Sequence, residues 1–544
     1  MRAAELFVEC LENEGVEYIF GIPGEENLDL MDALIDSPIR FITVRHEQGA
    51  AFMADVYGRL TGRPGVCLGT LGPGATNLIT GVADANLDRA PVVAIAGQGS
   101  THRLHKESHQ IVDLVNLFAP ISKYATSVRE PEVIPEIVRK AFKVAKTEKP
   151  GATFIELPEN IAEEQVAEAA PLPVQDPRPP WPAADRLAEA AALIAQAERP
   201  MVLAGNGVVR AGAAADLDAF AATLRIPVAM TFMAKGVIPR MHPLSLGTAG
   251  LSGNDLIACG FARADLVICV GYDMVEYHPE RWHRDPEQAV IHVGQLPAEV
   301  DAHYSLAAGV VGDIGAALRG LTERLTPRAD NWAAALSQAI HDENREHAGD
   351  DGFPVKPQKI LWDLRQLLAP EDILISDVGA HKMWIARMWQ AQAANTCIIS
   401  NGFAAMGIGV PGALAAKLVH PERQVVTITG DAGFLMNSQE IETALRLGLA
   451  FVVLIWNDAA YGLIKWHQDR RFGRDTQIDF GNPDFVQYAE SFGARGYRVE
   501  SAEQLVPVLE DALHCGTVAI VDCPVDYAEN MRLTERLAAL SCPV

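Results

Sequence analysis

The chain has 544 residues, too many for one hydrophobic core, and predicts about three or four domains. Hydrophobic residues make up 49% and charged residues 21%, which excludes wholesale disorder. Lys and Arg total 45 against 70 Asp and Glu, a net charge of −25, so binding to nucleic acid is not expected. Any electropositive pocket for an anionic substrate must be local.

Short apolar runs alternate with helical patterns along the whole chain. The runs are PGVCLGT, PVVAIAG, PMVLAG, DLVICVG, DILISD, QVVTITG and FVVLIW. This alternation predicts an α/β protein built from parallel sheets with helices on both faces. The proline-rich stretch Ala170–Asp185 and a weaker break at Thr326–Pro357 divide it. We therefore expect three doubly wound domains, 1–165, 186–325 and 357–544.

Neither a targeting segment nor a membrane span is expected. The N-terminal stretch mixes acids into an amphipathic pattern, and no apolar run approaches the roughly 18 residues that a spanning helix needs. This predicts a cytoplasmic protein. The eight cysteines contain no C-x-x-C pair, and five lie in apolar stretches, which indicates buried free thiols.

In the expected central domain, Gly205-Asn206-Gly207 follows an apolar run, as a dinucleotide-binding loop would. The third glycine of that motif is missing, so the indication of FAD or NAD is weak. In the first domain, His102, His105 and His109 have a spacing that could place three imidazoles on a helix face. No cysteine or acid completes a zinc site there, and we set zinc aside.

The strongest chemical signal lies in the last third of the chain. A predicted strand over 424–429 ends at Gly430-Asp431-Ala432-Gly433, and a second over 451–456 ends at Asn457. The spacing fits one helix plus one strand, so Asp431 and Asn457 should stand side by side at one sheet edge. Two oxygen ligands beside a helix N-terminus suit Mg²⁺ bridging a diphosphate. The alternative is an ordinary strand–helix turn with an acidic cap.

Asn437 stands three residues before Glu440 in the same region. This order predicts a capping box at the start of the helix that follows.

Several motifs together resemble the thiamine-diphosphate enzymes. Gly430-Asp431-Ala432 and Asn457 are separated by the residues 433–456, as in that family's fingerprint. The other motifs stand in the family's order: Gly21-Ile22-Pro23-Gly24, Arg45-His46-Glu47-Gln48, Gly72-Pro73-Gly74-Ala75-Thr76-Asn77, Asp377-Val378-Gly379 and Gly402-Phe403-Ala404-Ala405-Met406-Gly407. They cover nearly the whole chain and are most similar to acetolactate synthases of the catabolic, FAD-independent type.

The resemblance implies thiamine diphosphate and Mg²⁺ as cofactors. Glu47 would hydrogen-bond the aminopyrimidine and so activate the thiazolium carbon. The implied metal ligands are Asp431, Asn457 and the carbonyl of Ala459. Residues implied to bind the cofactor, besides Glu47, are Pro23, Gly24, Thr70, Pro73, Asn77, Gln98, Val378, Gly379, Ala380, His381, Gly402, Met406, Ala432, Gly433, Tyr461, Gly462 and Leu463.

The same resemblance implies an acetolactate synthase reaction. One pyruvate loses CO₂ on the cofactor, and the resulting enamine attacks a second pyruvate to give 2-acetolactate. Gln110, Lys123 and His467 would line the substrate pocket, with Lys123 receiving a carboxylate. The catabolic enzymes have Gln where His467 stands, so another 2-oxo acid or an acyl-CoA remains an alternative substrate.

Two further expectations come from the resemblance. The middle domain lacks the arginine-rich stretch of the FAD-containing synthases and reads Gly271-Tyr272-Asp273-Met274-Val275-Glu276-Tyr277 instead, so FAD is not expected. The family shares each active site between two chains, which implies a homodimer or homotetramer.

Overall fold

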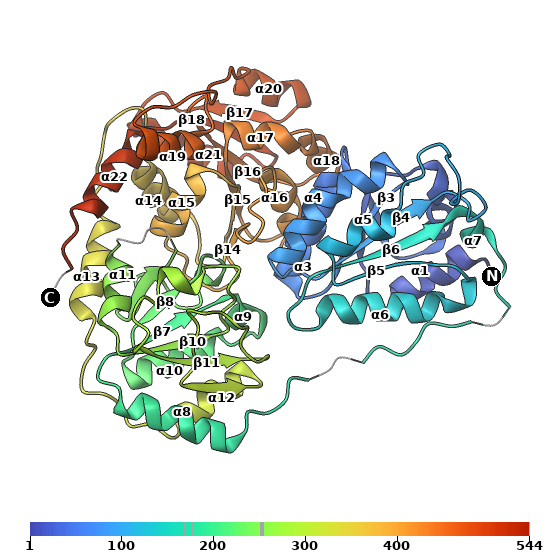
Figure 1. Ribbon diagram of the computed structural model, residues 1–544. Coiled ribbons are helices and arrows are strands. Elements are labelled where there is room, and N and C mark those ends of the chain that lie inside the picture. Colours follow the sequence, from blue (N-terminus) through green and yellow to red (C-terminus); the bar gives the residue numbers. More distant parts are fainter. Residues whose placement is uncertain (168, 176–177, 251–254, 543–544) are drawn as a thin grey trace.

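The computed structural model of the chain describes residues 1–167, 169–175, 178–250 and 255–542. These residues form three six-stranded sheets, and all the strand pairings within the sheets are parallel. Helices lie on both faces of each sheet (Figure 1). The predicted class, three doubly wound α/β domains, is confirmed.

The N-terminal sheet has the strand order β2-β1-β3-β4-β6-β5. Its strands are β1 (Tyr18–Gly21), β2 (Arg40–Thr43), β3 (Gly65–Gly69), β4 (Val92–Gln98), β5 (Tyr124–Ser127) and β6 (Ala152–Pro158). The helices around it are α1 (Ala3–Asn13), α2 (Leu28–Ala33), α3 (Glu47–Thr61), α4 (Pro73–Leu87), α5 (Leu114–Phe118), α6 (Ile134–Lys146) and α7 (Glu159–Glu163). Strands β3, β4 and β6 are buried throughout, as continuous apolar runs require.

The central sheet has the order β12-β11-β10-β7-β8-β9, the arrangement of dinucleotide-binding folds. Its strands are β7 (Pro200–Ala204), β8 (Val228–Met230), β9 (Ser245–Thr248), β10 (Leu266–Val270), β11 (Ala289–Gly294) and β12 (Ala308–Val311). The helices are α8 (Ala184–Gln196), α9 (Asn206–Arg210), α10 (Ala214–Leu224), α11 (Leu256–Arg263), α12 (Ile314–Thr322) and α13 (Ala334–Glu343). Helix α13 lies in the stretch expected to separate two domains, and it packs against α11 and β9.

The C-terminal sheet has the order β14-β13-β15-β16-β18-β17, which repeats the topology of the N-terminal sheet. Its strands are β13 (Ile373–Ser376), β14 (Cys397–Ile399), β15 (Val425–Gly430), β16 (Val452–Asn457), β17 (Arg495–Arg498) and β18 (Ala519–Pro524). The helices are α14 (Pro357–Leu367), α15 (Ala380–Met388), α16 (Gly409–Val419), α17 (Asp431–Asn437), α18 (Glu440–Arg446), α19 (Gly462–Phe472), α20 (Phe485–Phe492), α21 (Leu505–His514) and α22 (Ala528–Ala538).

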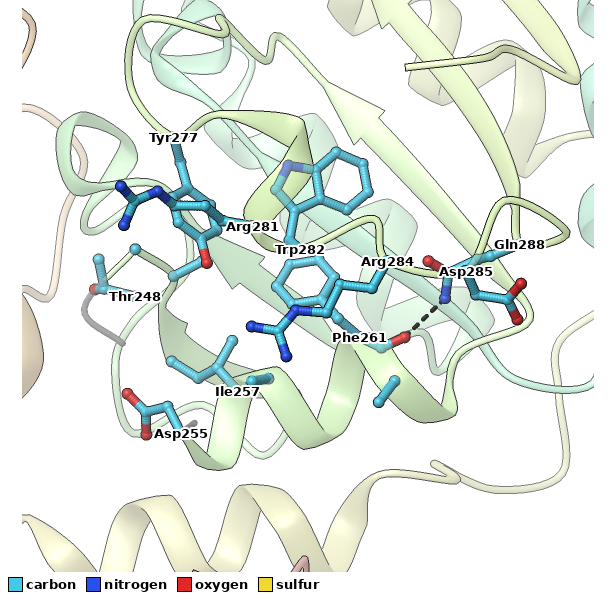
Figure 2. A pocket seen from close by; sticks show the side chains of 14 residues that line it. Thr248, Asp255, Ile257, Phe261, Tyr277, Arg281, Trp282, Arg284, Asp285 and Gln288 are labelled. Carbon is cyan, nitrogen blue, oxygen red and sulfur yellow. Dashed lines mark hydrogen bonds between the residues drawn. The ribbon is translucent and has the colours of Figure 1, made fainter. Parts of the chain in front are cut away.

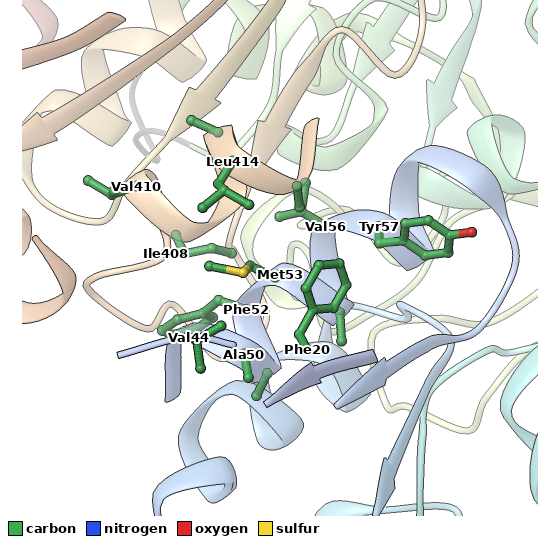
Figure 3. Packing of buried hydrophobic residues seen from close by; sticks show 14 of the residues in the cluster. Phe20, Val44, Ala50, Phe52, Met53, Val56, Tyr57, Ile408, Val410 and Leu414 are labelled. Carbon is green, nitrogen blue, oxygen red and sulfur yellow. The ribbon is translucent and has the colours of Figure 1, made fainter. Parts of the chain in front are cut away.

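One apolar core joins the two outer domains (Figure 3). Phe52, Met53 and Val56 of α3 pack with Ile408 and with Leu414 of α16, and all five are buried. Burying side chains of this size stabilises a fold by about 1.5–3 kcal/mol each. The N-terminal and C-terminal domains of one chain are therefore held together by a shared core.

A buried polar network crosses the same interface. Arg59 Nη2 donates to Asp88 at 2.6 Å, and Asp88 also accepts the backbone N–H of Gly402. The hydroxyl of Ser400 donates to Asp84 at 2.6 Å, and burial raises the pKa of Asp84 well above its usual value. The loop that follows β14 is thus fastened to the N-terminal domain, and Gly402 lies at this contact.

The cysteines depart from the sequence prediction at one pair. Cys259 and Cys542 form a disulfide with Cα atoms 5.7 Å apart, which ties the segment after α22 to α11 of the central domain. Free thiols were the wrong prediction for these two because a separation of 283 residues leaves no local pattern. Six other cysteines are free: Cys10, Cys67, Cys269, Cys397, Cys515 and Cys523.

No helix in the described part of the chain combines the length and apolar character needed to cross a membrane. The three histidines weighed for zinc lie in a stretch of turns, 101–110, and not on a helix.

Candidate active site

Strands β15 and β16 bring the two predicted metal ligands together. Gly430 pairs with Trp456 in the parallel register, so Asp431 and Asn457 stand side by side at the carboxyl edge of the sheet. The strands lie there because residues 425–429 and 452–456 are mostly apolar and buried throughout. The buried strands therefore carry the polar groups to a fixed position.

The oxygens at this edge converge. Asp431 Oδ2 accepts hydrogen bonds from the backbone N–H of Ala459 and from Nδ2 of Asn482, both at 2.7 Å. The same Nδ2 lies 3.1 Å from Oδ1 of Asn457. Asn457 in turn donates from Nδ2 to Asp522 at 2.9 Å, which directs its Oδ1 toward Asp431.

The third predicted ligand, the carbonyl of Ala459, lies in a left-handed turn with φ of 52°. A carboxylate, an amide oxygen and a backbone carbonyl are hard ligands of the kind Mg²⁺ prefers. Among the described residues no three His, Cys, Asp or Glu side chains cluster as a metal site. Because Mg²⁺ takes six oxygens, the donor set fits a cation shared with a diphosphate and water.

Burial shapes the charges at this edge. It raises the pKa of Asp431, although the hydrogen bonds from Asn482, Ala432 and Ala459 oppose the shift. Burial and the neighbouring carboxylate of Asp431 raise the pKa of Asp458 to about 7. A bound cation would relieve this desolvation, since it favours the ionised form of Asp431.

His381 lies beside the metal edge. Burial lowers the pKa of its imidazole to about 3, so the ring is neutral. Its Nε2 is buried and has no hydrogen-bond partner, and a Cβ on Gly430 would lie 3.5 Å from the ring. A neutral imidazole can donate to a phosphate oxygen. The ring follows Val378, Gly379 and Ala380, where α15 begins with Gly379 as its N-cap residue.

Asp377 positions the loop that carries Met406. Its carboxylate is fully buried and accepts the N–H groups of Val378, Gly407 and Gly409 at 2.6–2.9 Å. Burial raises the pKa of Asp377. Met406 is half-buried on this loop. Gly433 also faces Asp377, because a Cβ there would lie 3.2 Å from its Oδ1.

The N-terminal domain forms a second cluster around Glu47. Asn77 Nδ2 donates to Glu47 Oε2 at 2.9 Å. A Cβ on Gly74 would meet both Thr70 and Glu47, and a Cβ on Gly24 would clash with Thr70 at 2.3 Å. Gly24 follows β1, Glu47 follows β2, and the other residues follow β3. Strands β1 and β3 flank the topological switch point of the sheet, where ligands of such folds bind.

Local structure explains the position of Glu47. It is the first residue of α3, where the helix dipole favours a carboxylate, and it is 7% exposed. Pro73 similarly begins α4. The preceding turn is tied to the C-terminal domain, because Glu440 accepts the backbone N–H groups of Arg45 at 3.0 Å and His46 at 3.1 Å. Glu440 therefore does not form the predicted capping box.

Two predicted site residues are engaged elsewhere. Gln98 Nε2 donates to Glu156 at 2.9 Å and to the carbonyl of Val112 at 3.0 Å. Lys123 donates its ammonium protons to carbonyls of Val144, Thr147 and Lys149 at 2.5–2.7 Å, and burial lowers its pKa to about 8. The ammonium closes the end of α6, where its donors are bonded to backbone carbonyls rather than turned to a substrate.

The remaining pocket candidates lie on exposed elements. Gln110 is exposed, with φ of 57°, and its backbone packs beside Gly72 at the start of α4. His467 is exposed on α19, and partial burial, followed by the charge of Arg470, lowers its pKa. Tyr461, Gly462 and Leu463 open the same helix, and a Cβ on Gly462 would meet Asp458 at 2.7 Å.

Among the residues the structure describes, no hydrogen bond or ion pair joins Glu47 directly to Asp431, Asn457 or Ala459. The outer domains meet instead through α3 and α16, as Figure 3 shows.

The central domain's glycine loop is closed by its own chain. The N–H groups of Gly205 and Gly207 donate to the carbonyls of Val270 and Gly271 at 2.9 and 2.8 Å. The N–H of Asn206 donates to the carboxylate of Glu276 at 2.9 Å. The amides that a dinucleotide phosphate would use are therefore already bonded.

The central domain also has a cavity of about 210 Å³ (Figure 2). Phe261, Tyr277 and Trp282 line it, together with Arg281. Its residues come from the end of β9, from α11 and from the segment after β10.

The structure adds three residues to the site: Asp377, Asn482 and Asp522. The sequence analysis named Asp377 only within a family motif, although it follows a buried strand and stands two residues before a glycine, as Asp431 does. Asn482 and Asp522 give no such signal: the first lies in an irregular segment and the second inside β18.

The chain matches three family models along its length. These are described as the N-terminal TPP binding domain, the central domain and the C-terminal TPP binding domain of thiamine pyrophosphate enzymes, over residues 1–117, 187–321 and 377–523. The chain belongs to the thiamine pyrophosphate enzyme family.

Curated relatives match over nearly the full length. The chain is 37% identical to "Acetolactate synthase, catabolic" of Raoultella terrigena, with 98% of this chain and 97% of the relative covered. It is 36% identical to "Acetolactate synthase" of Bacillus subtilis, with 98% and 94% covered. It is 35% identical to "Probable acetolactate synthase large subunit" of Methanocaldococcus jannaschii, with 98% and 93% covered.

Proposed function

We propose that the protein is an acetolactate synthase that uses thiamine diphosphate and Mg²⁺. It converts two pyruvate molecules to one 2-acetolactate and one CO₂, with uptake of one proton. The observation that carries this proposal is the convergence of Asp431, Asn457 and Ala459 at one sheet edge. Full-length similarity to acetolactate synthases supports the choice of substrate.

The C-terminal cluster binds the charged end of the cofactor. Asp431, Asn457 and the Ala459 carbonyl would hold Mg²⁺, and the neutral imidazole of His381 could donate from its unpartnered Nε2 to a phosphate oxygen. The amides at Gly379 and Ala380 lie at the start of α15, where the helix dipole attracts a phosphate. Met406 lies on the loop that Asp377 fixes, and its side chain would contact the cofactor.

The N-terminal cluster sets the reactivity. Bound thiamine diphosphate supplies a nucleophilic carbon and takes up the electrons that decarboxylation leaves behind. Glu47 holds a proton at the pyrimidine nitrogen, and Asn77 orients the carboxylate for that contact. Pro23, Gly24 and Thr70 form the adjoining wall, where glycine allows a close approach.

Gln110 and His467 are proposed to line the substrate pocket. Both are exposed within one chain, as residues that face a second subunit would be. A neutral His467 donates one hydrogen bond to a substrate oxygen without adding a charge. Since Lys123 is engaged in its own domain, the pyruvate carboxylate is received by neutral donors.

We also propose a cytoplasmic homodimer or homotetramer that needs no flavin. The absence of a hydrogen bond or ion pair between Glu47 and Asp431 among the described residues supports a site shared by two chains. The bonded glycine loop at Gly205 and Gly207, with Glu276 at the N–H of Asn206, supports the absence of FAD.

The test is to incubate the purified protein with pyruvate, thiamine diphosphate and Mg²⁺, without FAD, and to identify the products by NMR. The proposal expects 2-acetolactate. Acetaldehyde as the sole product would make the protein a decarboxylase. Unchanged pyruvate would overturn the assignment of pyruvate as the substrate, and other 2-oxo acids and acyl-CoAs would then be tested.

A further inference from the structure

One short segment bonds to all three proposed metal ligands. This covering segment, residues 478–482, lies between α19 and α20. The Tyr461 N–H donates to the carbonyl of Ile478 at 3.0 Å, and Ala460 and Asp479 form an antiparallel bridge. Phe480 packs edge-on against the ring of Tyr461, with the ring centres 5.2 Å apart.

The contacts of the covering segment fall on the oxygens that would bind Mg²⁺. Asn482 Nδ2 donates to Asp431 at 2.7 Å and approaches Asn457 at 3.1 Å. The backbone N–H of Phe480 donates to the carbonyl of Ala459 at 3.1 Å. An N–H group of the covering segment thus lies beside each ligand oxygen, in a position where a bound cation would interact with that oxygen.

The orientation of the Asn482 amide follows from its surroundings. The Nδ2 of Asn457 is committed to Asp522, so its Oδ1 faces inward and can only accept. Asp431 is a carboxylate and also accepts only. The NH₂ of Asn482 must therefore face both, and its Oδ1 is left buried with no partner. An unpartnered buried carbonyl is costly, which makes this arrangement easy to displace.

We propose that Asn482 is a displaceable occupant of the cation position. Its amide holds Asp431 and Asn457 at their spacing while no metal is bound, and Mg²⁺ must remove it to reach both oxygens. Metal binding then shifts the covering segment. This inference rests on the proposed metal site.

The test compares Mn²⁺ affinity among variants in the presence of thiamine diphosphate, measured by the EPR signal of free Mn²⁺. Asn482→Ala and Asn482→Val remove the competing donor and are expected to bind Mn²⁺ more tightly, on the order of tenfold, since a hydrogen bond to a charged group is lost only from the metal-free protein. Thr476→Ala is the matched control, because Thr476 bonds to Gln468 through its backbone alone.

Unchanged affinity in both Asn482 variants would overturn the proposal. Weaker binding would also overturn it and would make Asn482 a ligand through its oxygen. If the unmodified protein binds no Mn²⁺, the proposed metal site is wrong. In that case Asp431→Ala would bind Mn²⁺ no more weakly than the unmodified protein does. Hydrogen exchange supplies a second readout: the Phe480 amide is expected to exchange faster once metal and thiamine diphosphate are bound, and equal rates would contradict the displacement.

Discussion

Some charged side chains of this protein are available to a ligand, and others are fully used in hydrogen bonds that stabilise the fold. Glu47 and Lys123 were both predicted to be catalytic. Glu47 has one side-chain hydrogen bond, from Asn77, and leaves Oε1 beside Gly74. The ammonium group of Lys123 donates hydrogen bonds to three backbone carbonyls. Glu47 therefore has an oxygen that can still bind a ligand, whereas the ammonium group of Lys123 does not have a free donor.

Glu47→Gln is expected to lower the rate of acetolactate formation by roughly 10²- to 10⁴-fold, the usual range for loss of a proton-holding group. The amide keeps the bond to Asn77 but carries no charge. Glu9→Gln, an exposed change on α1, serves as the control. Unchanged turnover of Glu47→Gln in the NMR assay would refute the assigned role.

Lys123→Met is expected to destabilise the protein by about 2 kcal/mol, because charge-assisted hydrogen bonds to the end of α6 are lost. Denaturant unfolding measures this. The KM for pyruvate should not change, and a large rise in KM at constant stability would return Lys123 to the substrate pocket.

At the scale of elements, the sequence was informative where strands are fully buried and uninformative where polar side chains choose distant partners. The apolar runs before Asp431 and Asn457 predict both strands, and the pairing of Gly430 with Trp456 follows from their spacing. The capping box at Asn437 was wrong. Asn437 ends α17 and donates to the carbonyl of Gly407 at 2.9 Å.

The reason is physical. Side chains such as Asn437 and Glu440 can satisfy a helix end or a distant backbone group equally well, and only the assembled fold determines which group is near. The disulfide between Cys259 and Cys542 escaped prediction for the same reason. Asn482 could not be found from the sequence, since its importance comes only from the two oxygens it faces.

The loop after β7 carries a pH-dependent contact. Burial raises the pKa of Glu276 to about 7, from 4.5. A raised carboxyl pKa contributes stability below pH 4.5 that is lost as the pH rises through 7. Glu276→Gln removes this pH-dependent contribution to stability. The melting temperature of the unmodified protein should therefore fall more between pH 6 and pH 8.5 than that of the variant. Equal falls would contradict a buried, titrating Glu276.

At the scale of the whole molecule, the two outer domains have the same strand order and share one core. Among the described residues, no hydrogen bond or ion pair joins Glu47 to Asp431. The shared core fixes the outer domains of a chain against each other. A second chain, with its own pair of domains fixed in the same way, can therefore bring Glu47 of one chain to Asp431 of the other without either chain changing shape.

This arrangement predicts complementation. Glu47→Gln and Asp431→Asn should each be inactive alone, whereas co-expression should restore about a quarter of the full activity, because half of randomly paired dimers are mixed and each mixed dimer has one intact site. Co-expressing Glu47→Gln with Glu47→Ala is the control and should restore nothing. If co-expression of Glu47→Gln and Asp431→Asn restores no activity although mass spectrometry shows mixed dimers, the whole site lies in a single chain.

The disulfide between Cys259 and Cys542 closes a covalent ring that contains the whole C-terminal sheet. A protease that cuts one peptide bond inside this ring opens the loop but releases no fragment. Such a nicked chain stays in one covalent piece, heavier by the one water molecule that hydrolysis adds, until a reductant is added. Cleavage between Cys259 and Cys542 therefore separates the chain into fragments only after the disulfide is reduced.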